Sequence, residues 1–332
     1  PKTMSTTDPV DQENKKACSS SIDVDQEFDP AAKFGSRLLT DKDAVFNHNA
    51  WDNVEWDEEQ EKHALSQIER QSSSPVPEEL RAQEISVLEQ YHSNAANYWN
   101  KFYHINENRF FKDRNWLRLE FPELFRTLDP AAGSKKIFEV GCGAGNTMFP
   151  LLQESKNPEL YVYGADFSST AVEVVKSSPN YDEARCKAFV WDLTSSSIPE
   201  DIEPESLDFV VLIFVLSAIH PDTWKQAVVN AHKMLKKGGV VLLRDYGRHD
   251  LAQLRFKAGR LLDENFYIRG DGTRVYFFTS EELESMFTAP VEGSSNPMFE
   301  VQQNAVDRRL IVNRSKKLKM YRVWLQCKFK KL

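Results

Sequence analysis

Short apolar runs alternate with amphipathic stretches in the second half of the chain. The runs are KIFEV (136–140), LYVYGAD (160–166), KAFVWDL (187–193), LDFVVLIFV (207–215) and GVVLLRDY (239–246). Residues 169–178 and 223–235 lie between them and have helical periodicity. Continuous Val, Ile and Leu runs separated by helices are typical of a parallel sheet that is covered on both faces. The pattern predicts an α/β fold with a doubly wound, mostly parallel sheet.

The two ends of the chain have different patterns. Two strand-like segments at 298–312 and 320–330 follow each other without a helix, which predicts antiparallel strands at the C-terminus. At the other end, residues 1–33 are polar and are predicted to be disordered. Helices are predicted from about Glu58 and, after a Ser/Pro break, over 79–102. We therefore expect an N-terminal helical and aromatic extension over 34–130 and an α/β domain over 131–332.

Three glycines crowd the turn after the first predicted strand, in FEVGCGAGNT (138–147). Gly141, Gly143 and Gly145 form a GxGxG pattern, whereas dinucleotide binders have GxGxxG and P-loops have a Gly-Lys-Ser/Thr sequence. In an open parallel sheet this turn is the usual ligand cradle. A tight turn that binds nothing is the simpler alternative for the glycines alone.

Two of the following strands end in an acid. Asp166 is placed to accept hydrogen bonds from ribose hydroxyls, and Asp192 from an adenine amine with Leu193 beside the ring. An Asp after a strand is often only a helix cap. Together, the glycines and the two acids indicate S-adenosylmethionine (SAM) bound by a class I methyltransferase sheet.

Charge is distributed unevenly along the chain, whose formal net charge is −8. Residues 1–90 carry 9 Lys/Arg and 20 Asp/Glu, whereas residues 301–332 carry 10 and 1. A basic tail suits a polyanionic partner, and a solvated charge run is the alternative. The four cysteines have no ligand spacing, and no apolar run approaches the ~20 residues of a membrane helix. No signal or transit pattern is seen, so we expect a cytoplasmic protein without metal or membrane association.

Several long strings resemble one family, the eukaryotic tRNA 3-methylcytidine methyltransferases. They cover most of residues 98–280 and are YWNKFYHINENRFFKDRNWL (98–117), EVGCGAGNTMFPLL (139–152), YGADFS (163–168), LIFVLSAIHPD (212–222), LLRDYGRHDLAQLRF (242–256) and FYIRGDGTRVYFFT (266–279). FGSRLL and NHNAWDNVEW resemble the branch that acts on threonine tRNAs. The resemblance implies SAM-dependent methylation of ring nitrogen 3 of an anticodon-loop cytidine.

The resemblance also implies cofactor contacts at particular positions. Trp99 and Tyr103, one helical turn apart on the N-terminal extension, match aromatic residues that cover the cofactor. Gly141, Asp166, Asp192, Leu193 and Ile213 match its remaining contacts. Without the resemblance, a core stripe would be the first interpretation of the two aromatic residues.

Cytosine N3 has a free in-plane lone pair at neutral pH, so the reaction needs alignment more than a general base. The product ring is cationic and a nearby carboxylate would stabilise it. Asp245 is our candidate for this role, with a salt bridge to Arg244 or Arg248 as the alternative.

Basic residues that interleave with aromatic ones suit an RNA that has splayed bases. Any single arginine is more often a surface ion pair, so the clustering carries this hypothesis. The candidates for tRNA contact are Lys112, Arg114, Arg248, Arg255, Lys257, Arg260, Arg269 and Arg274. A C-terminal group is expected to extend the surface and comprises Arg308, Arg309, Arg314, Lys316, Lys317 and Lys319.

Other functions stay open. One alternative is a methyltransferase for a protein or small molecule, and another is a catalytically silent tRNA-binding protein. Dependence on an auxiliary protein partner is also left open by the sequence.

Overall fold

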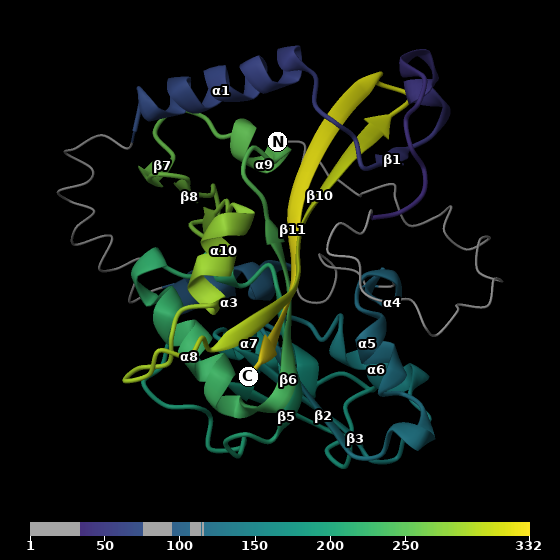
Figure 1. Ribbon diagram of the computed structural model, residues 1–332, viewed down its shortest axis with the longest axis vertical. Helices are drawn as coiled ribbons and strands as arrows, with labels where there is room; N and C mark the ends of the chain where they lie inside the picture. The colour runs from purple at the N-terminus through teal and green to yellow at the C-terminus, as the bar shows by residue number, and fades with distance from the viewer. Residues whose placement is uncertain (1–33, 76–94, 107–113, 115) are drawn as a thin grey trace.

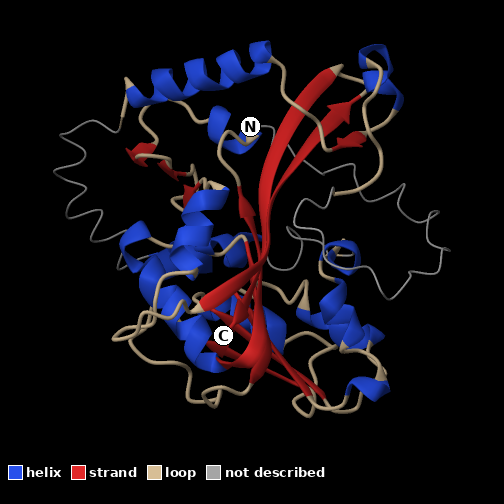
Figure 2. Cartoon of the chain, viewed as in Figure 1, coloured by secondary structure: helices blue, strands red, loops and turns tan. Residues whose placement is uncertain are grey.

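The computed structural model describes residues 34–75, 95–106, 114 and 116–332. Its central feature is an eight-stranded sheet with the strand order β1-β10-β11-β6-β5-β2-β3-β4 (Figures 1 and 2). The strands of this sheet are β1 (Ala50–Asp52), β2 (Lys135–Val140), β3 (Leu160–Asp166), β4 (Cys186–Val190), β5 (Leu207–Ile213), β6 (Leu235–Tyr246), β10 (Phe299–Asn313) and β11 (Leu318–Lys331).

The sheet is parallel in its centre and antiparallel at one side. β4, β3, β2, β5 and β6 pair in parallel, whereas β11, β10 and β1 are antiparallel. The predicted doubly wound sheet with antiparallel C-terminal strands is therefore confirmed. Several strand ends differ from the prediction, since β4 ends at Val190, β5 ends at Ile213 and β6 begins at Leu235.

Helices cover both faces of the sheet, as the continuous apolar strands require. One face packs against α8 (Trp224–Met234) and α10 (Ser280–Phe287), and the other against α4, α5, α6 and α7. Along β2, Phe138 and Val140 point into the first core and Ile137 into the second. The bounds of the second group are α4 (Leu117–Glu120), α5 (Pro122–Arg126), α6 (Met148–Glu154) and α7 (Ser169–Lys176).

β10 and β11 are long strands that continue past the end of β6. The last residue of β6, Tyr246, pairs with Trp324, and β11 begins six residues earlier at Leu318. At about 3.3 Å per residue, the hairpin projects roughly 20 Å beyond the carboxyl edge of the parallel strands. Figure 1 shows this projection running up to the region of β1 and α1.

The projecting hairpin carries a strand that the sequence did not reveal. Residues Ala50–Asp52 form β1, which pairs with β10 so that Trp51 lies opposite Leu310. Trp51 and Leu310 are buried together with Val45. The N-terminal extension thus contributes to the main sheet in addition to its helices.

The two longest described helices of the extension are α1 and α3. The predicted helix from Glu58 is confirmed as α1 (Glu58–Ser72), which Asp57 caps by accepting a hydrogen bond from the Gln60 N–H at 2.9 Å. The helix predicted over 79–102 is described only as α3 (Ala95–Asn106), because residues 76–94 lie outside the described residues. The predicted disorder of residues 1–33 also falls outside them.

A small three-stranded sheet forms a separate lobe between β6 and α10. Its strands are β7 (Leu261–Asp263), β8 (Phe266–Ile268) and β9 (Arg274–Tyr276), and the short helix α9 (Leu251–Leu254) precedes them. Tyr267, Val275 and Phe277 form its core. Figure 1 shows the lobe between α1 and α3, beside the long hairpin.

Candidate active site

The glycine-rich turn follows β2 at the carboxyl edge of the sheet. Gly141, Gly143 and Gly145 have φ values of +68°, +54° and +84°, which glycine adopts without the strain of other residues. A Cβ atom at Gly143 would lie 2.6 Å from the Tyr103 hydroxyl oxygen. The turn therefore needs glycine both for its dihedral angles and for the close approach of α3.

Asp166 fixes this turn from the neighbouring strand. One carboxylate oxygen accepts a hydrogen bond from the Gly143 N–H and the other from the Ser168 N–H, both at 2.9 Å. The side chain is buried, and this burial raises the pKa of Asp166 to about 6. Asp166 thus ties the glycine turn to the start of α7.

Asp192 lies in the loop after β4 instead of at the end of the strand. Its Oδ1 accepts hydrogen bonds from the Thr194 N–H and hydroxyl, both at 2.8 Å, in a turn that follows Val190. The strand ends early here because this local turn satisfies the backbone. Leu193 is buried beside it, and the Asn230 side chain donates to the Leu193 carbonyl oxygen at 2.8 Å.

Ile213 is the last residue of β5 and is buried. The next residue, Phe214, has a φ of +58°, so the chain turns sharply at this point. Ile213 therefore ends its strand at the same carboxyl edge as the glycine turn and Asp166.

Helix α3 lies over the glycine turn and is held at the start of α7. Trp99 and Tyr103 pack together with ring centroids 6.2 Å apart, and Tyr103 is only 5% exposed. Asn100 accepts hydrogen bonds from the Ser168 hydroxyl at 2.7 Å and the Thr170 N–H at 3.3 Å. Sequence reasoning missed Asn100, although its position three residues before Tyr103 places it on the same helical face.

Asp245 is fully buried at the end of β6. Its carboxylate accepts hydrogen bonds from the Ser217 N–H at 3.0 Å and the Tyr246 N–H at 2.8 Å. Burial raises the pKa of Asp245 to about 6, while the positive charge of Arg269 acts in the opposite direction. The carboxylate therefore stabilises the turn after β5, and it interacts electrostatically with the positive charge of Arg269.

The alternative in which Asp245 pairs with Arg244 or Arg248 is wrong. Arg244 pairs with Asp307 at 2.6 Å on the sheet, where both side chains are buried. Arg248 pairs with Glu282 at 2.9 Å and also donates to the Phe277 carbonyl oxygen.

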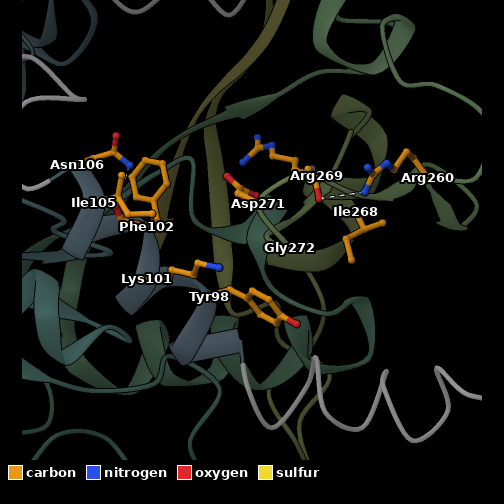
Figure 3. Close-up of a pocket in the computed structure, with 11 residues that line it drawn as sticks. Tyr98, Lys101, Phe102, Ile105, Asn106, Arg260, Ile268, Arg269, Asp271 and Gly272 are labelled. Atoms are coloured by element: carbon orange, nitrogen blue, oxygen red, sulfur yellow. Dashed lines mark hydrogen bonds between the residues drawn. The ribbon is translucent and has the colours of Figure 1, made fainter. Parts of the chain in front are cut away.

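A cavity of about 370 Å³ separates α3 from the three-stranded lobe (Figure 3). Arg269 lies with its guanidinium carbon 5.4 Å from the centroid of the Tyr246 ring. At the rim, a Cβ atom on Gly272 would lie 2.4 Å from the Tyr98 ring, so α3 and the lobe are in close contact there. The lining residues are Tyr98, Lys101, Phe102, Ile105 and Asn106 from α3, and Arg260, Ile268, Arg269, Gly270, Asp271 and Gly272 from the lobe.

The predicted tRNA-contact residues have different surroundings. Arg255, Lys257 and Arg260 are exposed, and Arg269 is half-buried in the cavity wall. Three of these basic residues lie in the segment between α9 and β7, and Arg269 directly follows β8 in the lobe.

Three other candidates interact within the protein. Arg114 pairs with buried Glu139 at 2.9 Å and donates to the Thr147 hydroxyl. Arg248 is held by Glu282, as described above. Arg274 is buried, and this burial lowers its pKa to about 10. Lys112 lies outside the described residues.

The C-terminal basic residues also divide into two groups. Arg309 forms ion pairs with Asp307 at 3.0 Å and Glu120 at 2.7 Å, so it links β10 to α4. The others are exposed on the projecting hairpin and comprise Arg308, Arg314, Lys316, Lys317 and Lys319.

Neither a metal site nor a membrane helix is found in the described part of the chain. No group of three or more His, Cys, Asp or Glu side chains in the described ranges is placed to hold a metal ion. No helix there is long and apolar enough to cross a membrane.

Comparison with known proteins identifies the family. A family model described as a methyltransferase domain matches residues 138–241. The chain is 50% identical to a tRNA N(3)-cytidine methyltransferase from Danio rerio, over 90% of this chain and 89% of that protein. It is 48% identical to a tRNA N(3)-methylcytidine methyltransferase from Schizosaccharomyces pombe, over 98% of this chain and 99% of that protein.

This chain belongs to the tRNA N(3)-cytidine methyltransferase family. A further relative in this family is the tRNA(Thr) (cytosine(32)-N(3))-methyltransferase of Saccharomyces cerevisiae, which is 48% identical over 90% of this chain and 45% of that protein. The resemblance drawn from the sequence is therefore confirmed.

A solved structure supports the fold independently. A SAM-dependent methyltransferase from Anabaena variabilis has a TM-score of 0.51 and 20% identity, covering 72% of this chain and 96% of that one. This likeness shows that the chain has the class I methyltransferase fold.

We predict that Gly143→Ala loosens α3 and that Gly133→Ala does not. Both glycines have positive φ, but a Cβ atom at Gly133 meets nothing within 4 Å. Both variants should lose about 1–2 kcal/mol of stability from backbone strain. Only Gly143→Ala should also speed amide hydrogen exchange in residues 95–106, because the added methyl group displaces Tyr103. Equal exchange in the two variants would contradict the close packing of α3 on the turn.

Proposed function

We propose that this protein transfers the methyl group of SAM to N3 of cytidine 32 in the anticodon loop of tRNA, with threonine tRNA as its substrate. The observation that carries the proposal is the position of α3 between two sites. One face of this helix places Tyr103 on the glycine turn, and another face places Tyr98 and Phe102 in the cavity. A cofactor on the turn and a base in the cavity would share this helix as a common wall.

The residues at the carboxyl edge fit SAM. The adenosyl part presents hydroxyl and amine donors, for which the carboxylates of Asp166 and Asp192 are suitable acceptors. Gly141, Gly143 and Gly145 leave the backbone bare at the turn. Leu193 and Ile213 supply apolar surface, and Trp99 and Tyr103 cover the site from α3. When bound, SAM supplies an electrophilic methyl group.

The chain's own contribution to the reaction is alignment and electrostatics. The attacking cytosine nitrogen needs no proton removed, so a general base is not required. As the cytosine ring becomes cationic, the negative charge of Asp245 stabilises it electrostatically. Asp245 is fully buried and does not line the cavity, so this interaction acts through space without direct contact. Burial raises the pKa of Asp245 to about 6, and the hydrogen bonds from Ser217 and Tyr246, with the charge of Arg269, act in the opposite direction, so the carboxyl is ionised near neutral pH.

The proposed tRNA surface consists of Arg255, Lys257, Arg260 and Arg269. Exposed cations on one lobe suit the phosphates that flank an extruded base. Arg114, Arg248 and Arg274 are left out of this surface because each already has partners within the protein. The exposed basic residues of the projecting hairpin extend the surface beyond the carboxyl edge, toward the stem of a bound anticodon arm.

Three further expectations belong to the proposal. The extension over 34–130 acts as a cofactor lid through α3 and supplies tRNA contacts, and the SAM-binding domain spans 131–332. The protein acts in the cytoplasm, where tRNAs take part in translation. Dependence on an auxiliary protein partner stays open, and such a partner would add to tRNA affinity.

The deciding experiment incubates the protein with SAM labelled in its methyl group and with total tRNA. Label is expected in 3-methylcytidine, mapped to position 32 of threonine tRNA by sequencing. Label that appears only in protein or in a small molecule would support a different methyltransferase and overturn the proposal. Measurable tRNA binding without any label would instead indicate a silent tRNA-binding protein.

Cofactor affinity should depend on pH through Asp166. The carboxylate form accepts hydrogen bonds from ribose hydroxyls, and its pKa is about 6 in the free protein. Affinity for S-adenosylhomocysteine should be constant above pH 7 and fall below pH 6, by up to about tenfold per pH unit. Isothermal titration calorimetry measures this affinity.

Two controls accompany the pH series. Because the pKa of Asp166 is raised above its ordinary value, its contribution to folding stability declines as the pH rises from about 4 to 6, so protonation of Asp166 does not itself destabilise the fold at low pH. In Asp166→Asn the affinity should be weaker and its fall below pH 6 should disappear. A fall of the same size in the variant would rule out Asp166 as the titrating group.

A further inference from the structure

Gln71, near the end of α1, is a buried amide with partners in the distant lobe. It is 3% exposed and, with Ala64, is one of two buried residues of this helix. Its Nε2 donates to the carbonyl oxygens of Gln253 at 2.9 Å and Phe256 at 3.0 Å, and its Oε1 accepts from the Tyr267 hydroxyl at 2.9 Å. Both donors and the acceptor of the side chain are thus used across the interface.

The partners of Gln71 lie next to the two arginines of the cavity. Phe256 is four residues before Arg260, and Tyr267 is two residues before Arg269. The rings of Phe256 and Tyr267 stack at 4.7 Å, which joins the two segments. The Ile268 N–H donates to the Arg260 carbonyl oxygen at 2.9 Å, and the Arg260 side chain donates to the Arg269 carbonyl oxygen at 3.5 Å.

A second contact joins the end of α1 to the same part of the lobe. The Gly259 N–H donates to the Ser74 carbonyl oxygen at 2.8 Å, just after the end of α1. Gln253 is a second buried glutamine that uses both amide hydrogens. Its Nε2 donates to Asn265 Oδ1 at 3.1 Å and to the Tyr267 hydroxyl at 3.4 Å. One amide at the end of α1 therefore contacts both segments that carry the cavity arginines, 256–260 and 267–269.

We propose that Gln71 is a positioning residue for tRNA binding, which holds Arg260 and Arg269 at the cavity through the Phe256 and Tyr267 segments. The proposal rests on the proposed function of the cavity. It gives α1 a role in substrate affinity, although this helix lines no part of the cavity itself. Buried polar groups of this kind specify one geometry because each unmade hydrogen bond is costly.

The test compares Gln71→Leu with Gln67→Leu, one turn earlier on the same helix. Gln67 is only half-buried, and its side-chain Oε1 accepts a hydrogen bond from the Arg70 side chain of the same helix. Gln71→Leu should raise KM and Kd for threonine tRNA about tenfold, because two carbonyl groups and a hydroxyl lose their partner and the arginines shift. Its Kd for S-adenosylhomocysteine should stay within about twofold of wild type, as should both affinities of Gln67→Leu.

A second measurement needs no tRNA. Amide hydrogen exchange of the free protein should be faster in residues 256–269 of Gln71→Leu than of wild type, with the main sheet unchanged. If wild type fails to methylate tRNA, the proposed function falls while this exchange result still reports on the Gln71 contacts. If Gln71→Leu is folded, exchanges like wild type and binds tRNA normally, the inference is overturned.

Tyr267→Phe covers the case in which Gln71→Leu does not fold. This change removes the hydrogen bond from the Tyr267 hydroxyl to Gln71, which is one of the three that Gln71 makes. It keeps the stack of the ring with Phe256. It should weaken tRNA binding about threefold and leave cofactor affinity unchanged. Equal losses of tRNA and cofactor affinity in this variant would show a general stability role and contradict positioning.

Discussion

The Asp166 carboxylate is the constraint on which the candidate site depends. With one oxygen it accepts from the glycine turn after β2, and with the other from the residue that caps α7. Ser168 in turn donates its hydroxyl to Asn100 of α3. The turn, the cap and the overlying helix are therefore positioned by one connected set of hydrogen bonds. Burying a carboxylate raises its pKa, and its two backbone donors offset that cost.

Helix α3, which these hydrogen bonds position, also forms one wall of the proposed tRNA cavity. Tyr103 meets the glycine turn, whereas residues 98, 102 and 105 line the cavity, a spacing consistent with one face of a helix of period 3.6. The opposite wall of the cavity is the three-stranded lobe, which is held by α1 through Gln71. The N-terminal extension is thus part of both halves of the proposed site, and its strand β1 also completes the edge of the main sheet.

The sequence predicted the parts of the molecule that obey local rules. The parallel strands are Val/Ile/Leu runs, and the glycine turn has a GxGxG spacing directly after the first of them, which is typical of a ligand-binding turn. β1 was missed because three residues, with one buried tryptophan, form a strand only where β10 supplies the partner. The lobe was missed for the same reason, since its strands have three residues each. Short strands owe their existence to tertiary contacts and have little pattern of their own.

The site residues likewise divide into those that local sequence patterns predict and those that depend on tertiary contacts. Positions defined by backbone, such as Gly141, Gly143 and Gly145, could be found from spacing alone. The fate of each arginine could not, because pairing depends on distant acids: Arg114 meets Glu139 and Arg248 meets Glu282 only in the folded chain. Gln71 carries no sequence signal at all, since its partners lie more than 180 residues away.

The measurement that tests the central claim most directly is the binding of two ligands to two variants. Asp192→Ala should weaken S-adenosylhomocysteine binding at least about tenfold and leave the affinity for tRNA within twofold, because Asp192 lies in the loop after β4 and lines no part of the cavity. Arg269→Ala should weaken tRNA by a similar factor and spare the cofactor analogue. Equal loss of both ligands in either folded variant would contradict the separation of a cofactor site at the sheet edge from a tRNA site on the lobe.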